Sequence, residues 1–196
     1  MPRRKKEKKV SKEMILTLFI AFIMIASVLG YSILQGDQIQ KRKYGDIVLV
    51  QRDMSWVAKV NQHELKFRYL PEELQDIEIG QEAVESIRNT YEVDTTSAPD
   101  DENKEAIALF QHDLAGLLDS MDIYLRQGFT EENEFDLPII SCANATSSVP
   151  VLKLATANST VFSMQDGCMI AEASSSVGFI KLRDKLMYSL IGISVG

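Results

Sequence analysis

The sequence has few of the residues from which most catalytic and metal sites are built. Its 196 residues include only two histidines, His63 and His112, and only two cysteines, Cys142 and Cys168. The chain contains no HExxH, no CxxC and no histidine pair at i, i+4, so neither histidine has a metal-ligating partner at a short spacing. The sequence therefore predicts no metal, no cofactor and no catalytic residue.

Nucleophile and phosphate-binding motifs are missing as well. There is no G-x-S-x-G elbow and no glycine-rich phosphate cradle. Acidic residues are numerous, but they gather at 72–73, 100–102 and 131–136, in segments predicted to be loops or helix starts. Solvated loops and helix caps account for such clusters. An enzyme on this chain would need an active site assembled from scattered residues.

Charge is divided unevenly along the chain. Residues 1–13 hold seven lysines and arginines against two acids, a net charge of +5, whereas the remainder holds 14 against 26, a net charge of −12. An acidic body repels the phosphates of nucleic acids at every approach. We therefore expect no nucleic-acid partner.

The longest apolar run covers residues 14–34, which are 21 residues without a charge. A helix of that length spans about 31 Å, close to the ~30 Å hydrocarbon core of a bilayer, so the run predicts a transmembrane helix. A cleaved signal peptide is the alternative, with a tolerable site at Val28-Leu29-Gly30, although the apolar run continues past it.

The flanking charges predict an orientation for this helix. Seven lysines and arginines precede it, against three at positions 41–43 after it. The positive-inside rule then leaves the N-terminus in the cytoplasm and the acidic domain outside a cell membrane that the chain crosses once.

This topology would expose both cysteines to an oxidising environment. Cys142 and Cys168 lie 26 positions apart, and a disulfide between them would stabilise the fold by roughly 3 kcal/mol on the loop-entropy model. The alternative is two buried free thiols, which behave as small apolar residues. Asn144 and Asn158 each begin an Asn-x-Ser/Thr triplet, so both are candidates for glycosylation if the host has that system.

Periodicity predicts an α+β fold for the exported part. Alternating apolar residues indicate strands, with hairpin turns at Asn61-Gln62 and Asp166-Gly167, and apolar residues at three- and four-residue steps indicate two amphipathic helices, near 100–121 and 179–193. The predicted organisation is a basic cytoplasmic tail (1–13), a transmembrane helix (14–34), a linker (35–45) and a mixed-sheet domain (46–196).

Three stretches carry a resemblance to a known family. They are "YLPEE" at 69–73, "LPIISCANATSSVPV" at 137–151 and "DKLMYSLIGI" at 184–193. In these the sequence resembles small single-pass membrane proteins of archaea that have no assigned function. The resemblance implies an anchor, an extracytoplasmic α/β domain and a paired Cys142 and Cys168. It carries over no catalytic residue.

These observations predict a membrane-anchored extracytoplasmic binding or assembly module of the cell envelope. Its expected partners are the lipid bilayer and another envelope or membrane protein. Two alternatives stay open: an extracytoplasmic enzyme with a site that matches no motif, and a protein that responds to thiol–disulfide exchange. A pocket that contains a carboxylate with a strongly displaced pKa would favour the enzyme, because such groups cluster at active sites.

Overall fold

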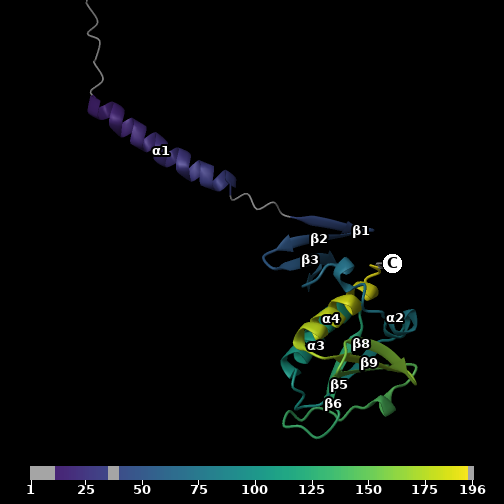
Figure 1. The fold of residues 1–196 in the computed structure, drawn as a ribbon. Helices are drawn as coiled ribbons and strands as arrows, with labels where there is room; N and C mark the ends of the chain where they lie inside the picture. The colour runs from purple at the N-terminus through teal and green to yellow at the C-terminus, as the bar shows by residue number, and fades with distance from the viewer. Residues whose placement is uncertain (1–11, 35–39, 194–196) are drawn as a thin grey trace, which may run out of the picture. The chain divides into compact units, whose positions relative to one another are not determined.

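The computed structural model describes residues 12–34 and 40–193, and it divides the chain into two units, 1–39 and 40–196. Within the described residues there are four α-helices and nine strands in two sheets. The first unit contributes one helix, α1 (Lys12–Leu34), and all other elements belong to the second unit, here called the domain (Figure 1).

The prediction of a transmembrane helix is wrong. Over the described residues, no helix combines the length and the apolar character that a membrane crossing requires. The predicted localisation, a single-pass protein of the cell membrane with its domain outside, is overturned by the same finding. Most of the predicted basic tail, residues 1–11, and residues 35–39 of the predicted linker lie outside the described residues.

The domain begins with a four-stranded antiparallel sheet in which each strand pairs with the next. Its strands are β1 (Lys41–Tyr44), β2 (Ile47–Arg52), β3 (Ser55–Val60) and β4 (His63–Phe67). Asn61 and Gln62 join β3 to β4 with φ angles of 47° and 71°. Two consecutive positive φ angles are typical of the tight hairpin turn that matches strand twist, so the turn predicted at these residues is confirmed although it lacks glycine.

A five-stranded sheet follows, in the order β6-β5-β7-β9-β8. Its strands are β5 (Glu92–Ser97), β6 (Tyr124–Phe129), β7 (Val151–Thr156), β8 (Val161–Gln165) and β9 (Cys168–Ala173). All neighbours in it are parallel except β8 and β9, which form the predicted hairpin at Asp166-Gly167. The connecting helices are α2 (Gln81–Arg88), α3 (Lys104–Asp119) and α4 (Ser176–Leu190), with 3₁₀ turns η1 (Pro71–Leu74) and η2 (Cys142–Asn144).

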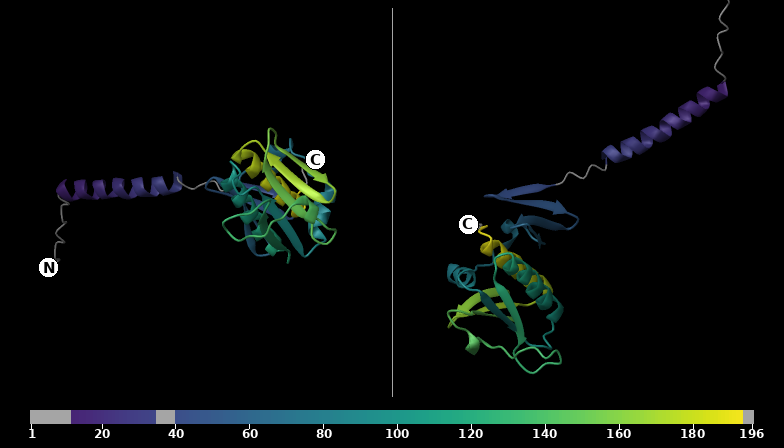
Figure 2. Two further views of the ribbon diagram at one scale, coloured as in Figure 1. Left: turned by 90° about the horizontal axis from the view of Figure 1, so that it is seen from below. Right: turned by 180° about the vertical axis from the view of Figure 1, so that it is seen from behind.

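One hydrophobic core joins the two sheets and the helices. Helices α3 and α4 pack against each other, and α4 reaches both sheets (Figures 1 and 2). At the first sheet, the rings of Phe67 and Tyr188 stack with centroids 4.1 Å apart, and Tyr188 also donates a hydrogen bond to the carbonyl of Tyr69. Since α4 contributes to the packing of both sheets, the domain behaves as a single packed body.

The predicted class, α+β with two main helices, agrees with the domain, but several details differ. The strands form two sheets and not one mixed sheet, and β1 lies inside the segment predicted as a linker. Residues 137–141 are irregular apart from one bridge between Phe129 and Ile139. Their backbone leaves the sheet edge to cross the face of the five-stranded sheet opposite the helices, where Ile140 packs on Val151 and Cys168.

Candidate functional site

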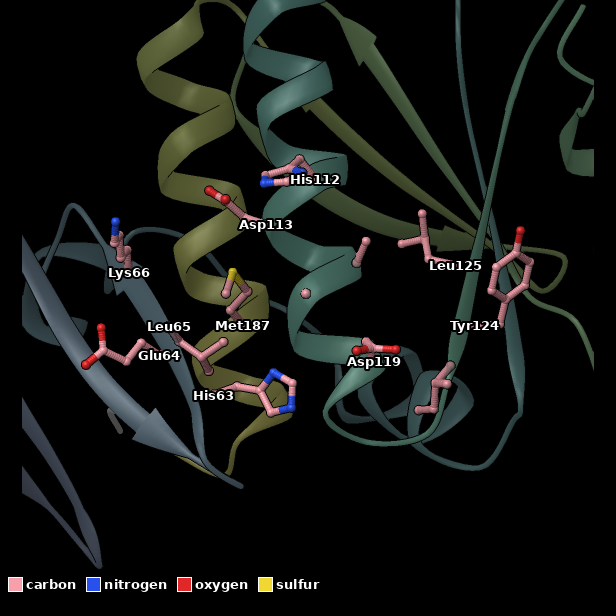
Figure 3. A pocket seen from close by; sticks show the side chains of 13 residues that line it. His63, Glu64, Leu65, Lys66, His112, Asp113, Asp119, Tyr124, Leu125 and Met187 are labelled. Carbon is pink, nitrogen blue, oxygen red and sulfur yellow. The ribbon is translucent and has the colours of Figure 1, made fainter.

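An open groove of about 600 Å³ runs along one side of α3, between the two sheets (Figure 3). Both sheets present an edge strand to it: β4 ends the four-stranded sheet and β6 ends the five-stranded one. The two strands lie to either side of α3 in Figure 3, and α3 contacts both of them. We call this feature the α3 groove.

The α3 groove has a buried apolar floor and an exposed polar rim. Leu65, Ile123, Leu125 and Met187 are buried at its base. The rim carries both histidines of the chain together with charged side chains and one phenol, namely His63, Glu64, Lys66, His112, Asp113, Asp119 and Tyr124. This combination of an apolar surface and a few polar groups is typical of ligand-binding clefts.

Local sequence places the rim residues. His63 is the first residue of β4, directly after the Asn61-Gln62 turn, and the Asn61 amide donates a hydrogen bond to the carbonyl of Ser120 at the end of α3. That bond fixes the tip of the hairpin against the helix. His112 and Asp119 lie seven positions apart on α3, close to two helical turns, and therefore share one face of the helix.

Gly116 lies on that face, in the middle of α3, and keeps the groove open. A glycine inside a helix is destabilising by about 1 kcal/mol relative to alanine. Packing does not require it, because a Cβ added at Gly116 would meet no atom within 4 Å. The residue lines the groove, so a larger side chain there would project into the free space.

The rim side chains divide into paired and unpaired groups. Glu64 pairs with Arg52 at 3.2 Å, and Asp113 pairs with Arg183 at 2.6 Å. The side chains of His63, His112 and Asp119 make no hydrogen bond or ion pair with any residue in the described part of the chain. These three groups are therefore free to bind a ligand.

Next to the groove lies a buried ionic network that is fully bonded. Arg183 donates from Nε and Nη2 to Oδ1 of Asp184, and Oδ2 of Asp184 accepts the backbone N–H groups of Arg68 and Tyr69. Burial raises the pKa of Asp184, an effect that the guanidinium of Arg183 and the two N–H bonds oppose. The network fastens α4 to the end of β4 and is structural.

A second polar cluster joins the ends of β5 and β7. Asp101 accepts hydrogen bonds from the N–H of Asn103 and from both the hydroxyl and the N–H of Thr156. Burial alone would raise the pKa of Asp101, but these hydrogen bonds outweigh it and the pKa lies below its ordinary value. The cap position of α3 is occupied by Asn103, so the helix begins after the acidic cluster at 100–102.

The disulfide between Cys142 and Cys168 is present, with their Cα atoms 5.3 Å apart. It joins η2 to the first residue of β9 and fastens the 130–149 segment to the outer face of the five-stranded sheet. Cys168 is buried and Cys142 is half-buried. The bond lies among apolar side chains, away from the residues that line the α3 groove.

The two glycosylation candidates lie apart from each other and from the groove. Asn144 is exposed in η2, where its side-chain oxygen accepts hydrogen bonds from the N–H and hydroxyl of Ser141. Asn158 is exposed in the loop between β7 and β8. Glycosylation at either residue stays a prediction. Within the described residues, no group of three or more His, Cys, Asp or Glu side chains could hold a metal ion.

Sequence reasoning considered both histidines but missed the groove that unites them. Their separation of 49 positions carries no motif, and only the packing of β4 against α3 brings them to one rim. Gly116 was the one local signal, since it interrupts an otherwise apolar helical pattern without being near either end of the helix.

The chain matches no protein-family model, no curated protein and no solved structure. The resemblance to small archaeal proteins therefore stays a prediction.

Proposed function

We propose that the domain is a protein-binding module whose α3 groove takes an extended peptide segment of its partner. The observation that carries this proposal is the open space above Gly116, which lies between two edge strands. Glycine at this position makes the helix about 1 kcal/mol less stable than alanine would, although packing would accept a side chain there. The space that glycine leaves is therefore available to a ligand.

The edge strands favour an extended ligand. A strand at the border of a sheet has backbone N–H and C=O groups without a partner strand, and peptides bind such edges by adding a strand of their own. Both β4 and β6 are border strands that line the groove. The only pairing found on the outer edge of β6, among described residues, is the bridge between Phe129 and Ile139 at its far end.

The lining indicates the chemistry of the segment. The buried floor suits apolar side chains, and the unpaired His63, His112 and Asp119 supply hydrogen-bonding groups at the rim. Of the rim charges, Glu64 and Asp113 already have partners. We therefore expect a segment with alternating apolar and polar side chains and little net charge, held mainly by backbone hydrogen bonds and apolar burial.

The distribution of shifted pKa values supports binding over catalysis. The carboxylate whose pKa is raised, Asp184, does not line the groove, and its oxygens are fully bonded within the protein. The thiol–disulfide alternative gains no support either, because Cys168 is buried.

A peptide library selected against the full chain tests the proposal, with two variants at one position as the comparison. Gly116→Trp should abolish binding of the selected peptides, because the indole fills the floor. Gly116→Ala should keep binding within about twofold and raise the stability of the fold by up to ~1 kcal/mol. Binding is measured by fluorescence anisotropy of the labelled peptides, and folding of both variants by thermal melting.

Three results would contradict the proposal. The library could yield no peptide that binds the chain, the peptides could bind Gly116→Trp as well as the unchanged chain, or competition could show that they bind elsewhere. A Gly116→Trp protein that melts far below the unchanged chain would show that the floor is needed for packing, which also contradicts the account.

A further inference from the structure

The outer face of the four-stranded sheet is basic, although the chain as a whole is acidic. Strand register puts Val50, Val57 and Lys66 in line across β2, β3 and β4, on the side opposite the core residues Leu49, Ala58 and Leu65. Alternation along each strand assigns the rest of this face. Its residues, here called the basic face, are Lys41, Lys43, Val48, Val50, Arg52, Val57, Lys59 and Lys66, with Glu64.

The basic face combines positive charge with an apolar stripe. It carries five lysines and arginines against one acid, Glu64, in a chain whose net charge is −7. Val48 is 41% exposed, and Val57 is buried but does not belong to the core of the domain. Lysine stems next to the valines shield them in part, as long basic side chains commonly do. An acidic partner with apolar side chains would fit this face.

The segment Thr130–Ile139, here called the acidic loop, has the complementary character. It contains Glu131, Glu132, Glu134 and Asp136. Between and after these acids, Phe135, Leu137 and Ile139 are 59%, 37% and 56% exposed. Three large apolar side chains exposed in a single ten-residue segment are typical of a contact surface, not of a solvated loop.

The acidic loop is held in one shape. The side-chain oxygen of Asn133 accepts hydrogen bonds from the N–H groups of Phe135 and Leu137, and its amide donates to the carbonyl of Leu137. The ring of Phe135 stacks on Phe129 with centroids 5.8 Å apart. A loop that is already ordered loses little conformational entropy when it binds.

The basic face and the acidic loop lie at opposite ends of the domain. In Figure 1 the strands β1–β3 are at one end and the loop that follows β6 is at the other, and the view from behind in Figure 2 agrees. One copy of the domain therefore cannot bring its own loop onto its own face. We infer that the acidic loop of one copy binds the basic face of a second copy.

The two surfaces differ, so the contact is head-to-tail. A head-to-tail contact leaves one free face and one free loop on every pair, and it builds rings or open chains instead of closed dimers. Opposite charges at the contact make it sensitive to salt, with a screening length of about 8 Å at 0.15 M ionic strength. The basic face shares Glu64 and Lys66 with the rim of the α3 groove, whereas Lys43 and Lys59 do not line the groove.

Zero-length cross-linking of lysine to carboxylate tests the inference directly. A mixture of the unlabelled and the ¹⁵N-labelled full chain should give mixed-isotope cross-links between peptides that contain Lys43 or Lys59 and peptides that contain residues 131–136. Reversing charge on the face (Lys43→Glu with Lys59→Glu) or on the loop (Glu132→Lys with Glu134→Lys) also removes groups that react with the cross-linker. The effect of each reversal is therefore read by sedimentation velocity, in which self-association of the full chain should weaken by about tenfold.

An experiment that mixes the two charge-reversed variants decides whether the face and the loop contact each other. The lysines of the reversed loop can bind the glutamates of the reversed face, so cross-links between these segments should return when the two variants are combined and stay absent when each is alone. Recovery in the mixture also shows that both variants are folded. Glu82→Lys with Glu105→Lys, on exposed positions of α2 and α3, should leave the cross-links of the otherwise unchanged chain as they were.

The inference is overturned if only cross-links within one isotope occur, which would mean that no second copy is bound. It is equally overturned if self-association is as strong in both reversed proteins as in the unchanged chain, or if cross-links do not form in the mixture. Association through other parts of the chain would be insensitive to these charges and would count against it. Peptide binding at the α3 groove should be unchanged in both variants, so the two proposals fail separately.

Discussion

Two sets of polar side chains meet at α3 and have opposite characters. On one side, Arg183, Asp184 and Asp113 are bonded to each other and to backbone N–H groups. On the other side, His112 is exposed in the α3 groove without a side-chain partner in the described residues. Asp113 and His112 are neighbours in sequence, yet one completes the buried network and the other faces free space. Complete bonding with burial indicates a structural role, whereas exposure at a cavity with no packing requirement indicates a binding role.

The largest effect is expected in the buried network. Asp184→Asn replaces the carboxylate next to the buried Arg183 with an amide whose NH₂ opposes the guanidinium. Removing one partner of a buried ion pair typically destabilises a protein by about 3–5 kcal/mol. Denaturant unfolding measures the change. Asp119→Asn on the exposed groove rim is the matched control and should change stability by less than about 0.5 kcal/mol. An equal loss of stability at Asp184 and Asp119 would contradict the assignment of a structural role to the buried network and a binding role to the groove.

The disulfide gives the next largest effect and is also distant from the groove. Changing either cysteine to alanine should lower the free energy of unfolding by roughly 3 kcal/mol. Serine should separate the two positions, because Cys168→Ser leaves a hydroxyl in a buried apolar site, whereas Cys142→Ser leaves one that is half-exposed. Thermal melting of the alanine and serine variants, with and without reductant, measures these changes in stability. If Cys142→Ser were the more harmful change, the assigned environments would be wrong.

The smallest effect concerns acid stability. The pKa of Asp101 is lower in the folded protein than its ordinary value of 3.8, so the hydrogen bonds to its carboxylate contribute stability above that value. This contribution is lost as the pH falls through the lowered pKa. Asp101→Asn should therefore lower the Tm near neutral pH, and the difference from the unchanged chain should shrink as the pH falls below 3.8. A difference that is constant with pH would contradict the assignment.

Local signals in the sequence were sufficient for the hairpins, the main helices and the α+β class. Asp166-Gly167 predicted a turn because tight hairpins need residues that tolerate positive φ, and Asn61-Gln62 predicted one because it separates two runs of alternating residues. Both pairs have positive φ angles in the structure. The Cys142–Cys168 bond was also predicted, although by an argument that began from a membrane topology. The structure confirms the bond and contradicts the transmembrane helix from which the argument started.

What the sequence did not reveal depends on tertiary packing. The division into two sheets depends on which strands pair, and no local pattern shows where a strand finds its partner. The α3 groove draws its lining from β4, α3, β6 and α4, which are distant in sequence. The basic face required strand register, because its lysines are scattered singly between apolar residues along 41–66.

Site-specific photo-cross-linking from position 124 tests the central claim most directly. A photoreactive phenylalanine analogue replaces Tyr124, an exposed aromatic residue that lines the α3 groove, in the full chain and in the cells that make it. The same analogue at Glu82, on the exposed side of α2, serves as the control. If the α3 groove binds an extended segment, light should join position 124, and not position 82, to one stretch of a second polypeptide that alternates apolar and polar residues. Cross-links no more frequent or defined at position 124 than at position 82 would contradict the claim.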